Sequence, residues 1–262
     1  MIVKSLAPNT HFLVSQNPAD GLFQEGRRLW EQQRFSDAAK SWGQAAMSKH
    51  AASHAYLSEM LIDGKQDVPK DEKRAFELAA AGAVMGCAHS KGVLGRCYVH
   101  GAGVVKDLGK GLAFGRQSAA VGSCFGQFVV GKCYQEGWGV AQDYTEAARW
   151  WRLAAAQGHA RAQSSLGAIL MLKLLLSAEE LRQDRIVAGN YAEAERWFRL
   201  SAAQGCAAAQ NNLGVMFLNG RGVAKDTAEA IRWFRLAAAQ GEELAIENLM
   251  MLGVFFGGGG ER

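Results

Sequence analysis

A glycine-rich loop followed by a lysine is the first place in this sequence where binding chemistry could reside. In the stretch LNGRGVAKD, Gly220 and Gly222 precede Lys225. Such a loop can hold a phosphate on its backbone amides, with a cation to balance the charge. The same spacing also suits a tight turn that needs two residues in left-handed backbone geometry.

The recurrence of this loop favours the turn. Two more copies, HGAGVVKD and EGWGVAQD, begin at His100 and Glu136, and the second has Gln142 where the cation should stand. A phosphate site needs its cation, whereas a turn needs only its glycines. We therefore predict structural turns, with positive φ at Gly139 and Gly222. The predicted turn glycines are Gly101, Gly103, Gly137, Gly139, Gly220 and Gly222.

The histidines and cysteines form no metal-binding or catalytic pattern. The sequence lacks HExxH, P-loop, paired CxxC and GxSxG motifs. His89 and His100 would share a helix at a distance of about 16 Å, which is too far for one metal. The five cysteines form no local pair, and an odd number favours reduced thiols. We expect no enzymatic activity, no cofactor and no metal.

Composition indicates an ordered, helix-rich protein. Hydrophobic residues make up 49% of the 262 residues, with only three prolines. The net charge of +4 is spread along the chain and gives no specific nucleic-acid signal. Pro8, Asn9 and His11 interrupt the apolar core that a signal peptide would need. We expect an intracellular protein without a membrane span, in the cytoplasm or, as an alternative, in a mitochondrion or another organelle.

Two markers repeat along the chain with one shared period. Leucine–glycine or valine–glycine pairs recur at steps of 36, 36 and 47 residues, beginning at Leu94, and glycines at Gly86, Gly122, Gly158, Gly205 and Gly241 step by 36, 36, 47 and 36. Independent markers with the same period and the same interruption indicate a solenoid of stacked repeats.

Each repeat predicts two helices. In the segment TAEAIRWFRLAAAQ, the apolar residues fall at helical spacing and form one buried stripe. Asp226 with Glu229, and Asp143 with Glu146, resemble capping boxes at the start of the second helix. Glycine ends that helix, where a left-handed residue is needed.

These residues resemble the Sel-one-like repeat, a relative of the tetratricopeptide repeat. The shared pattern is AxxxLG, GxGVxxD, AxxW and AAxxG. The first unit instead follows tetratricopeptide spacing, and the second is degenerate. The resemblance implies an all-α, right-handed α-solenoid that serves as a non-catalytic scaffold, adaptor or accessory subunit of a larger assembly. It also covers extracellular relatives with disulfides beside the alanine pair, but the corresponding positions here are Val121, Gln157, Gln204 and Gln240.

The expected domain organisation is a single repeat domain over residues 19–255. An extension (1–18) precedes it and a glycine-rich tail (256–262) follows it. The expected units are about 19–50, 51–86, 87–122, 123–158, 159–205 and 206–241, closed by a capping helix over 242–255.

The inner face of the curved stack is the surface expected to bind a protein partner, because first helices line it in such families. Phe125 and Phe128 stand out, since exposed aromatic residues are enriched where partners dock, although either could belong to the core. The candidate partner-binding residues are His89, Arg96, His100, Phe125, Phe128, Lys132, Glu136, Arg161, Asn211 and Asn219.

The repeat over 159–205 is 11 residues longer than the others, close to three helical turns. We expect its first helix to continue to about Leu181 and the second to be capped by Asn190. The apolar residues of the insertion cover more than one face of the helix, so we expect a second surface to cover them. Leu172, Leu175 and Leu176 are therefore candidate contacts to a partner, a second copy or another part of the chain.

Two other functions remain open. One is a small-molecule-binding protein or enzyme on a repeat scaffold. The other is a nucleic-acid-binding subunit of an organellar complex, against which the mixed charges of Lys132 and Glu136 argue.

Overall fold

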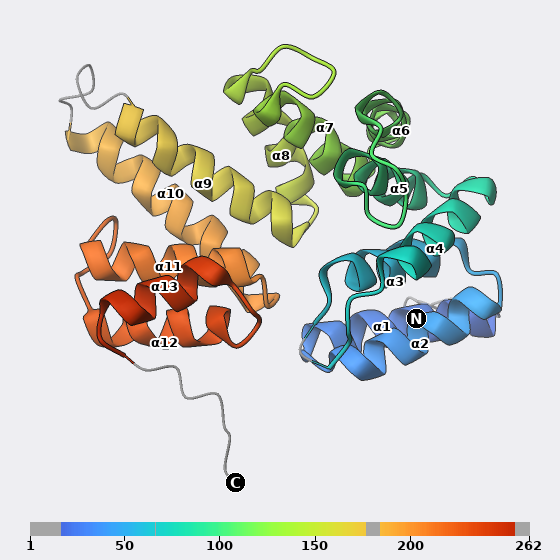
Figure 1. Ribbon diagram of the computed structural model, residues 1–262, viewed down its shortest axis with the longest axis horizontal. Coiled ribbons are helices and arrows are strands. Elements are labelled where there is room, and N and C mark those ends of the chain that lie inside the picture. Colours follow the sequence, from blue (N-terminus) through green and yellow to red (C-terminus); the bar gives the residue numbers. More distant parts are fainter. Residues whose placement is uncertain (1–16, 66, 177–183, 255–262) are drawn as a thin grey trace, which may run out of the picture.

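The computed structural model describes residues 17–65, 67–176 and 184–254, with side chains undescribed over 172–189 (Figure 1). The described residues contain thirteen α-helices and no named strand, which confirms the predicted all-α repeat fold. The helices are α1 (Pro18–Glu31), α2 (Phe35–Met47), α3 (Ala51–Asp63), α4 (Glu72–Val84), α5 (Ala88–His100), α6 (Leu108–Ala120), α7 (Cys124–Glu136), α8 (Tyr144–Ala156), α9 (Ala160–Leu176), α10 (Asp184–Ala203), α11 (Ala207–Asn219), α12 (Thr227–Ala238) and α13 (Glu243–Met251).

The helices pair as consecutive hairpins, and the hairpins follow an arc (Figure 1). The glycine of each leucine–glycine pair explains how tightly the two helices of a hairpin approach. A Cβ at Gly131 would lie 2.5 Å from Nε1 of Trp151, and one at Gly214 would lie 2.5 Å from Cε1 of Phe234. Both rings are fully buried. The first helix therefore needs a residue without a side chain where the second helix inserts its aromatic ring.

Aspartate begins the second helix of most units, as predicted. The Asp143 carboxylate accepts hydrogen bonds from the N–H groups of Thr145 and Glu146, and Asp226 accepts one from Glu229. In a complete capping box, the glutamate side chain would also accept a hydrogen bond from the aspartate N–H. Here the N–H of Asp226 instead donates to the carbonyl of Phe217 at 2.9 Å, which ties the turn to the first helix.

The 11-residue insertion lengthens both helices of its hairpin. Helix α9 has 17 described residues and α10 has 20, against 13 in α7 and in α8. Asn190 lies inside α10, so the prediction that it caps this helix is wrong. The physical reason is that two antiparallel helices of similar length can continue to cover one another.

The predicted end near Leu181 and the candidate contacts Leu172, Leu175 and Leu176 lie outside the residues whose side chains are described. Within the described part of the chain, no helix is both long enough and apolar enough to cross a membrane.

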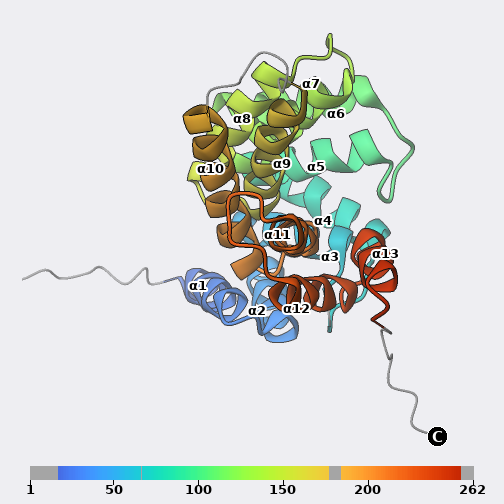
Figure 2. The ribbon, with the colours of Figure 1, turned by 90° about the vertical axis from the view of Figure 1, so that its left-hand side faces the viewer.

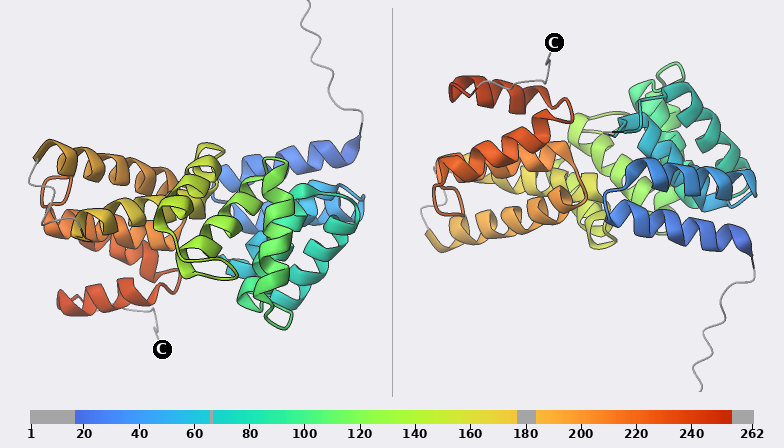
Figure 3. Two further views of the ribbon diagram at one scale, coloured as in Figure 1. Left: turned by 90° about the horizontal axis from the view of Figure 1, so that it is seen from above. Right: turned by 90° about the horizontal axis from the view of Figure 1, so that it is seen from below.

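The arc bends far enough to bring the first hairpin back to the later ones (Figures 2 and 3). Gln33 donates from Nε2 to the carbonyl of Ala203 at 3.4 Å, and Lys65 donates from Nζ to the carbonyl of Gly205 at 3.2 Å. The ring of Phe35 lies over Gly205. The inner face is therefore partly enclosed rather than open along one side.

Candidate protein-binding hollow

The glycine loops are turns whose first two amides are already engaged. Gly139 and Gly222 have φ values of 71° and 75°, as predicted. The N–H groups of Gly101 and Ala102 both donate to the carbonyl of Cys97. These amides point back into their own helix and are not free to surround a phosphate.

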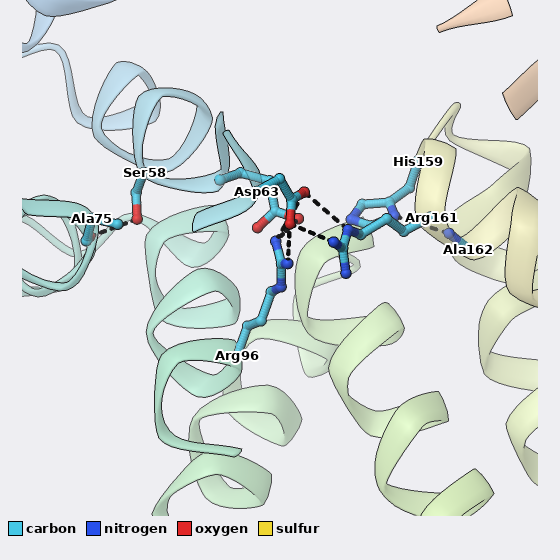
Figure 4. Close-up of polar contacts among 8 residues, drawn as sticks. Ser58, Asp63, Ala75, Arg96, His159, Arg161 and Ala162 are labelled. Atoms are coloured by element: carbon cyan, nitrogen blue, oxygen red, sulfur yellow. Dashed lines mark hydrogen bonds and ion pairs between the residues drawn. The ribbon is translucent and has the colours of Figure 1, made fainter. Parts of the chain in front are cut away.

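A cluster of charged side chains links α3, α5 and α9, which are the first helices of three units (Figure 4). Asp63, at the end of α3, accepts hydrogen bonds from Arg96 on α5 and from Arg161 at the start of α9. Arg161 Nε lies 2.9 Å from Asp63 Oδ2. Glu59 completes the cluster, since its Oε1 lies 2.7 Å from Arg96 Nη1. Only 5% of the Arg96 side chain is exposed, so this is a buried ion network.

The network fixes the charge of its members. Burial alone would raise the pKa of the Asp63 carboxyl, but the two arginines outweigh burial and hold the pKa well below its usual range. Burial alone would lower the pKa of Arg96, but Asp63 and Glu59 raise it instead. Burial also lowers the pKa of Lys65, against the opposing effect of Asp63. Pairing with the two arginines thus keeps the Asp63 carboxylate ionised.

Phe125 and Phe128 face inward but are covered by other side chains. Phe125 packs edge-on to Tyr56 and His159, and Phe128 stacks on His159 with ring centres 4.8 Å apart. Only 6% and 5% of the two phenylalanines remain exposed. The expectation of open aromatic anchors is therefore corrected. The bend of the arc brings Tyr56, from a unit two repeats earlier, onto Phe125.

His159 is a buried histidine that also shapes a helix start. Its Nδ1 accepts a hydrogen bond from the N–H of Ala162 in the first turn of α9. Burial lowers the pKa of His159 to about 4, with Arg96 and Arg161 acting in the same direction. The ring is therefore neutral at pH 7, with its uncharged Nδ1 serving as the cap.

A hollow of about 1030 Å³ opens beside this cluster. Residues of α1 to α3 form one wall, and residues of α7, of the starts of α9 and α11, and of the turn between α12 and α13 form the other. Of the ten candidate partner-binding residues, four line it: Phe125, Phe128, Lys132 and Arg161.

The other six candidates are distributed around the hollow. Arg96 lies behind it and pairs with its lining acids, Glu59 and Asp63. The lining residues do not include His89, His100, Glu136, Asn211 or Asn219. His89 bonds Ser123 and Asn211 bonds Asn248, so both serve contacts between helices.

Sequence reasoning missed the charged residues that α3 and the loop after it contribute to this site. Glu59, Asp63 and Lys65 all come from the degenerate second unit, where no family pattern drew attention to them. The signal available was a pair of acids at i and i+4, which places both on one face of a helix.

Sequence reasoning also missed a set of glutamine pairs that link the two helices within a unit. A glutamine at the end of the second helix donates from Nε2 to Oε1 of a glutamine on the first helix. The donors occupy three of the positions that carry cysteine in disulfide-containing relatives. The pairs are Gln157–Gln127, Gln204–Gln163 and Gln240–Gln210, at 2.9, 2.9 and 2.8 Å.

Among the described residues, no group of three or more histidine, cysteine or acidic side chains could hold a metal ion. All five cysteines are free, and burial raises the pKa of Cys97 to about 12, so this thiol is a poor nucleophile.

Comparison with known proteins agrees with this architecture. The Sel1 repeat model matches residues 51–86, 93–123, 125–159, 178–206 and 207–242. A Sel1 repeat protein from Oxalobacter formigenes is 26% identical, covers 88% of this chain and 89% of its own, and superposes with a TM-score of 0.55. The Pseudomonas aeruginosa protein PA5086 is 18% identical over 88% of this chain and 87% of its own, with a TM-score of 0.51, a likeness of fold alone. A search of curated proteins found no match. With five matched repeats over more than half of its length, the chain belongs to the Sel1 repeat family.

Proposed function

We propose that this protein is a non-catalytic scaffold that binds a protein partner in the hollow on its inner face. Sel1 repeat proteins are generally protein-interaction scaffolds. The observation that carries the proposal is the hollow itself, which is walled by both ends of the arc and is large enough for several side chains.

The composition of the walls supports a peptide-like occupant. The rings of Trp30, Trp42 and Tyr56 line the same hollow as the half-buried cations Lys132 and Arg161. Mixed aromatic and charged linings are typical of the centre and rim of protein interfaces. Phe125, Phe128 and Arg96 would act in binding as the rigid support behind these groups.

A space-filling substitution tests the proposal without disturbing the ion network. Ala208 is exposed, lines the hollow and is the second residue of α11, so Ala208→Trp should occupy the hollow. Ala228 is also exposed and is the second residue of α12, but it is not among the lining residues, so Ala228→Trp is the matched control.

The measurement is quantitative affinity capture from cells of the source organism, followed by titration of the captured protein. We expect at least one protein to be bound equally by the wild type and Ala228→Trp, and about tenfold more weakly by Ala208→Trp. A partner bound equally by all three would place the binding site outside the hollow.

A further inference from the structure

Three second helices share a five-residue pattern that packing explains only in part. The pattern is RWWRL from Arg149, and RWFRL from Arg196 and from Arg232. Its third residue is the ring buried against the glycine of the first helix. The packing within a repeat does not require the final leucine of the pattern to be apolar.

These leucines are exposed at the same position of three successive second helices, and we call them the leucine ladder. Leu153 on α8 is 46% exposed, Leu200 on α10 is 44% exposed and Leu236 on α12 is 52% exposed. The equivalent position holds Ala81 in the second unit and Gln117 in the third. An exposed leucine is therefore not required by the fold, and its repetition in three successive units is unexplained by stability.

The surroundings of the ladder are uniform from unit to unit. An exposed arginine directly precedes each leucine, and an exposed alanine follows it three positions later, where a small side chain permits close approach. The arginines are Arg152, Arg199 and Arg235, and the alanines are Ala156, Ala203 and Ala239.

The three helices follow one another around the arc (Figure 1). An ion pair of 3.4 Å links Arg152 on α8 to Glu193 on α10. The ladder leucines do not line the hollow, whereas Ala203 and Ala239, one turn further along their helices, do, so the ladder borders the hollow.

We propose that the leucine ladder docks an acidic, amphipathic helix of a protein partner. An amphipathic helix offers apolar side chains about every 5 Å along one face, with charged residues beside them. Apolar residues of the partner would pack between the leucines, and its carboxylates would meet the arginine row.

Charge complementarity favours this partner over other anions. Six arginines of the three patterns face four glutamates, in the pairs Arg149–Glu146, Arg152–Glu193, Arg199–Glu195 and Arg232–Glu229. The excess is positive, which suits an acidic helix. The interleaved glutamates oppose the continuous phosphate backbone of a nucleic acid and the headgroups of an anionic membrane.

The test is a display library of helical peptides selected on the full-length protein. The ladder variant is Leu153→Gln, Leu200→Gln, Leu236→Gln, which installs the residue that the third unit carries naturally. The control is Val84→Gln, Val105→Gln, Leu244→Gln, at three exposed apolar positions outside the ladder. Circular dichroism and thermal unfolding establish that both variants are folded.

We expect selection on the wild type to enrich peptides with leucine on one face and glutamate beside it. Their affinity should fall at least about tenfold on the ladder variant, and stay unchanged on the control and on Ala208→Trp. Selected peptides that bind the ladder variant as well as the wild type would overturn the proposal. Ladder-dependent binding of a single-stranded oligonucleotide or of phosphatidylserine vesicles, with no such peptide, would also overturn it. Peptides lost only on Ala208→Trp would support the hollow and contradict the ladder.

Discussion

The inner face of the arc differs between its middle and its C-terminal end. Along α3, α5 and α9, the first helices meet through a buried ion network centred on Asp63 and Arg96. Between α11 and α13, the corresponding contact is one neutral hydrogen bond, from Asn248 to Asn211 at 2.9 Å. A glycine nevertheless receives an aromatic ring in both regions, in the α9–α10 and α11–α12 hairpins, whereas Gly95 of α5 packs against the backbone of Gly111 and Gly115.

This difference separates two tasks within one repeat. The glycine–aromatic contact and the aspartate cap are set by the hairpin and recur with little change. The inner-face residue is free to vary, because it touches only the neighbouring unit or a ligand. Specific function is therefore to be sought at inner-face and outer-face positions, and stability at the recurring ones.

The largest contrast is expected on removing the polar partner in each region. Arg96→Ala leaves the Glu59 carboxylate without its cation and Asp63 with Arg161 alone, which should cost about 3 kcal/mol of unfolding free energy. Asn211→Ala removes a neutral hydrogen bond and should cost about 1 kcal/mol. Denaturant unfolding of both variants measures the contrast. Equal losses would mean that the ion network contributes no more than the amide pair.

Acid should destabilise the whole protein through a buried histidine in the middle of the arc. The pKa of His159 is about 4 in the folded protein, against about 6.5 when unfolded. The unfolded chain alone is protonated between these values, so the unfolding free energy falls as pH drops from about 6.5 to 4, by about 3 kcal/mol in total.

The control for this prediction is His159→Asn, which keeps a side chain able to cap α9 but does not titrate in this range. His100, whose pKa burial also lowers to about 4, is present in both proteins. The comparison therefore isolates His159. Urea unfolding at several pH values measures the unfolding free energy of both proteins. If that free energy depends on pH equally in wild type and variant, His159 is not the group responsible.

The shared glycine–aromatic contact should be equally sensitive in both regions. Gly131→Ala and Gly214→Ala each place a methyl group 2.5 Å from a buried ring atom, so each should cost about 2 kcal/mol. Gly109→Ala, where the nearest atom would be 3.5 Å away, should be neutral or stabilising. Thermal unfolding of the three variants checks this, and a cost confined to one region would show that the hairpins are not equivalent.

The smallest effect is expected at the turn glycines. Gly139→Ala introduces a side chain at positive φ with 3.3 Å to its nearest neighbour, and should cost about 1 kcal/mol. Gly222→Ala should cost more, because its methyl group would also lie 2.7 Å from Cβ of Tyr191. Chemical denaturation distinguishes the two, and a neutral Gly139→Ala variant would contradict the strain argument.

The repeated features were predictable from the sequence, while contacts between distant units were not. The spacing of Gly139, Asp143 and Gly158 predicts local turns, caps and helix ends, which depend on a few neighbouring residues. The burial of Phe125 depends on Tyr56, which belongs to a unit two repeats away. That contact is set by the curvature of the whole stack, a sum of small rotations that no local pattern encodes.

The insertion shows the same limit on a smaller scale. Its length was readable from the two markers, and its apolar residues indicated helix. Whether one helix or both would lengthen depends on how the antiparallel partners cover one another. The outcome, with Asn190 inside α10, follows from that pairing rather than from the capping preference of one residue.

The return of the arc onto itself changes how the chain can vary and fold. In an open stack each unit touches only its neighbours, so units can be gained or lost. Here Gln33 and Ala203, 170 residues apart, and Lys65 and Gly205, 140 residues apart, are hydrogen-bonded. Such contacts raise the contact order, which slows folding and couples the ends into one cooperative transition. They also fix the number of repeats between them, since an added unit would carry Gly205 away from Lys65. A longer hairpin such as α9–α10 extends without changing that count, so this molecule can grow outward at its hairpin tips but not along its length.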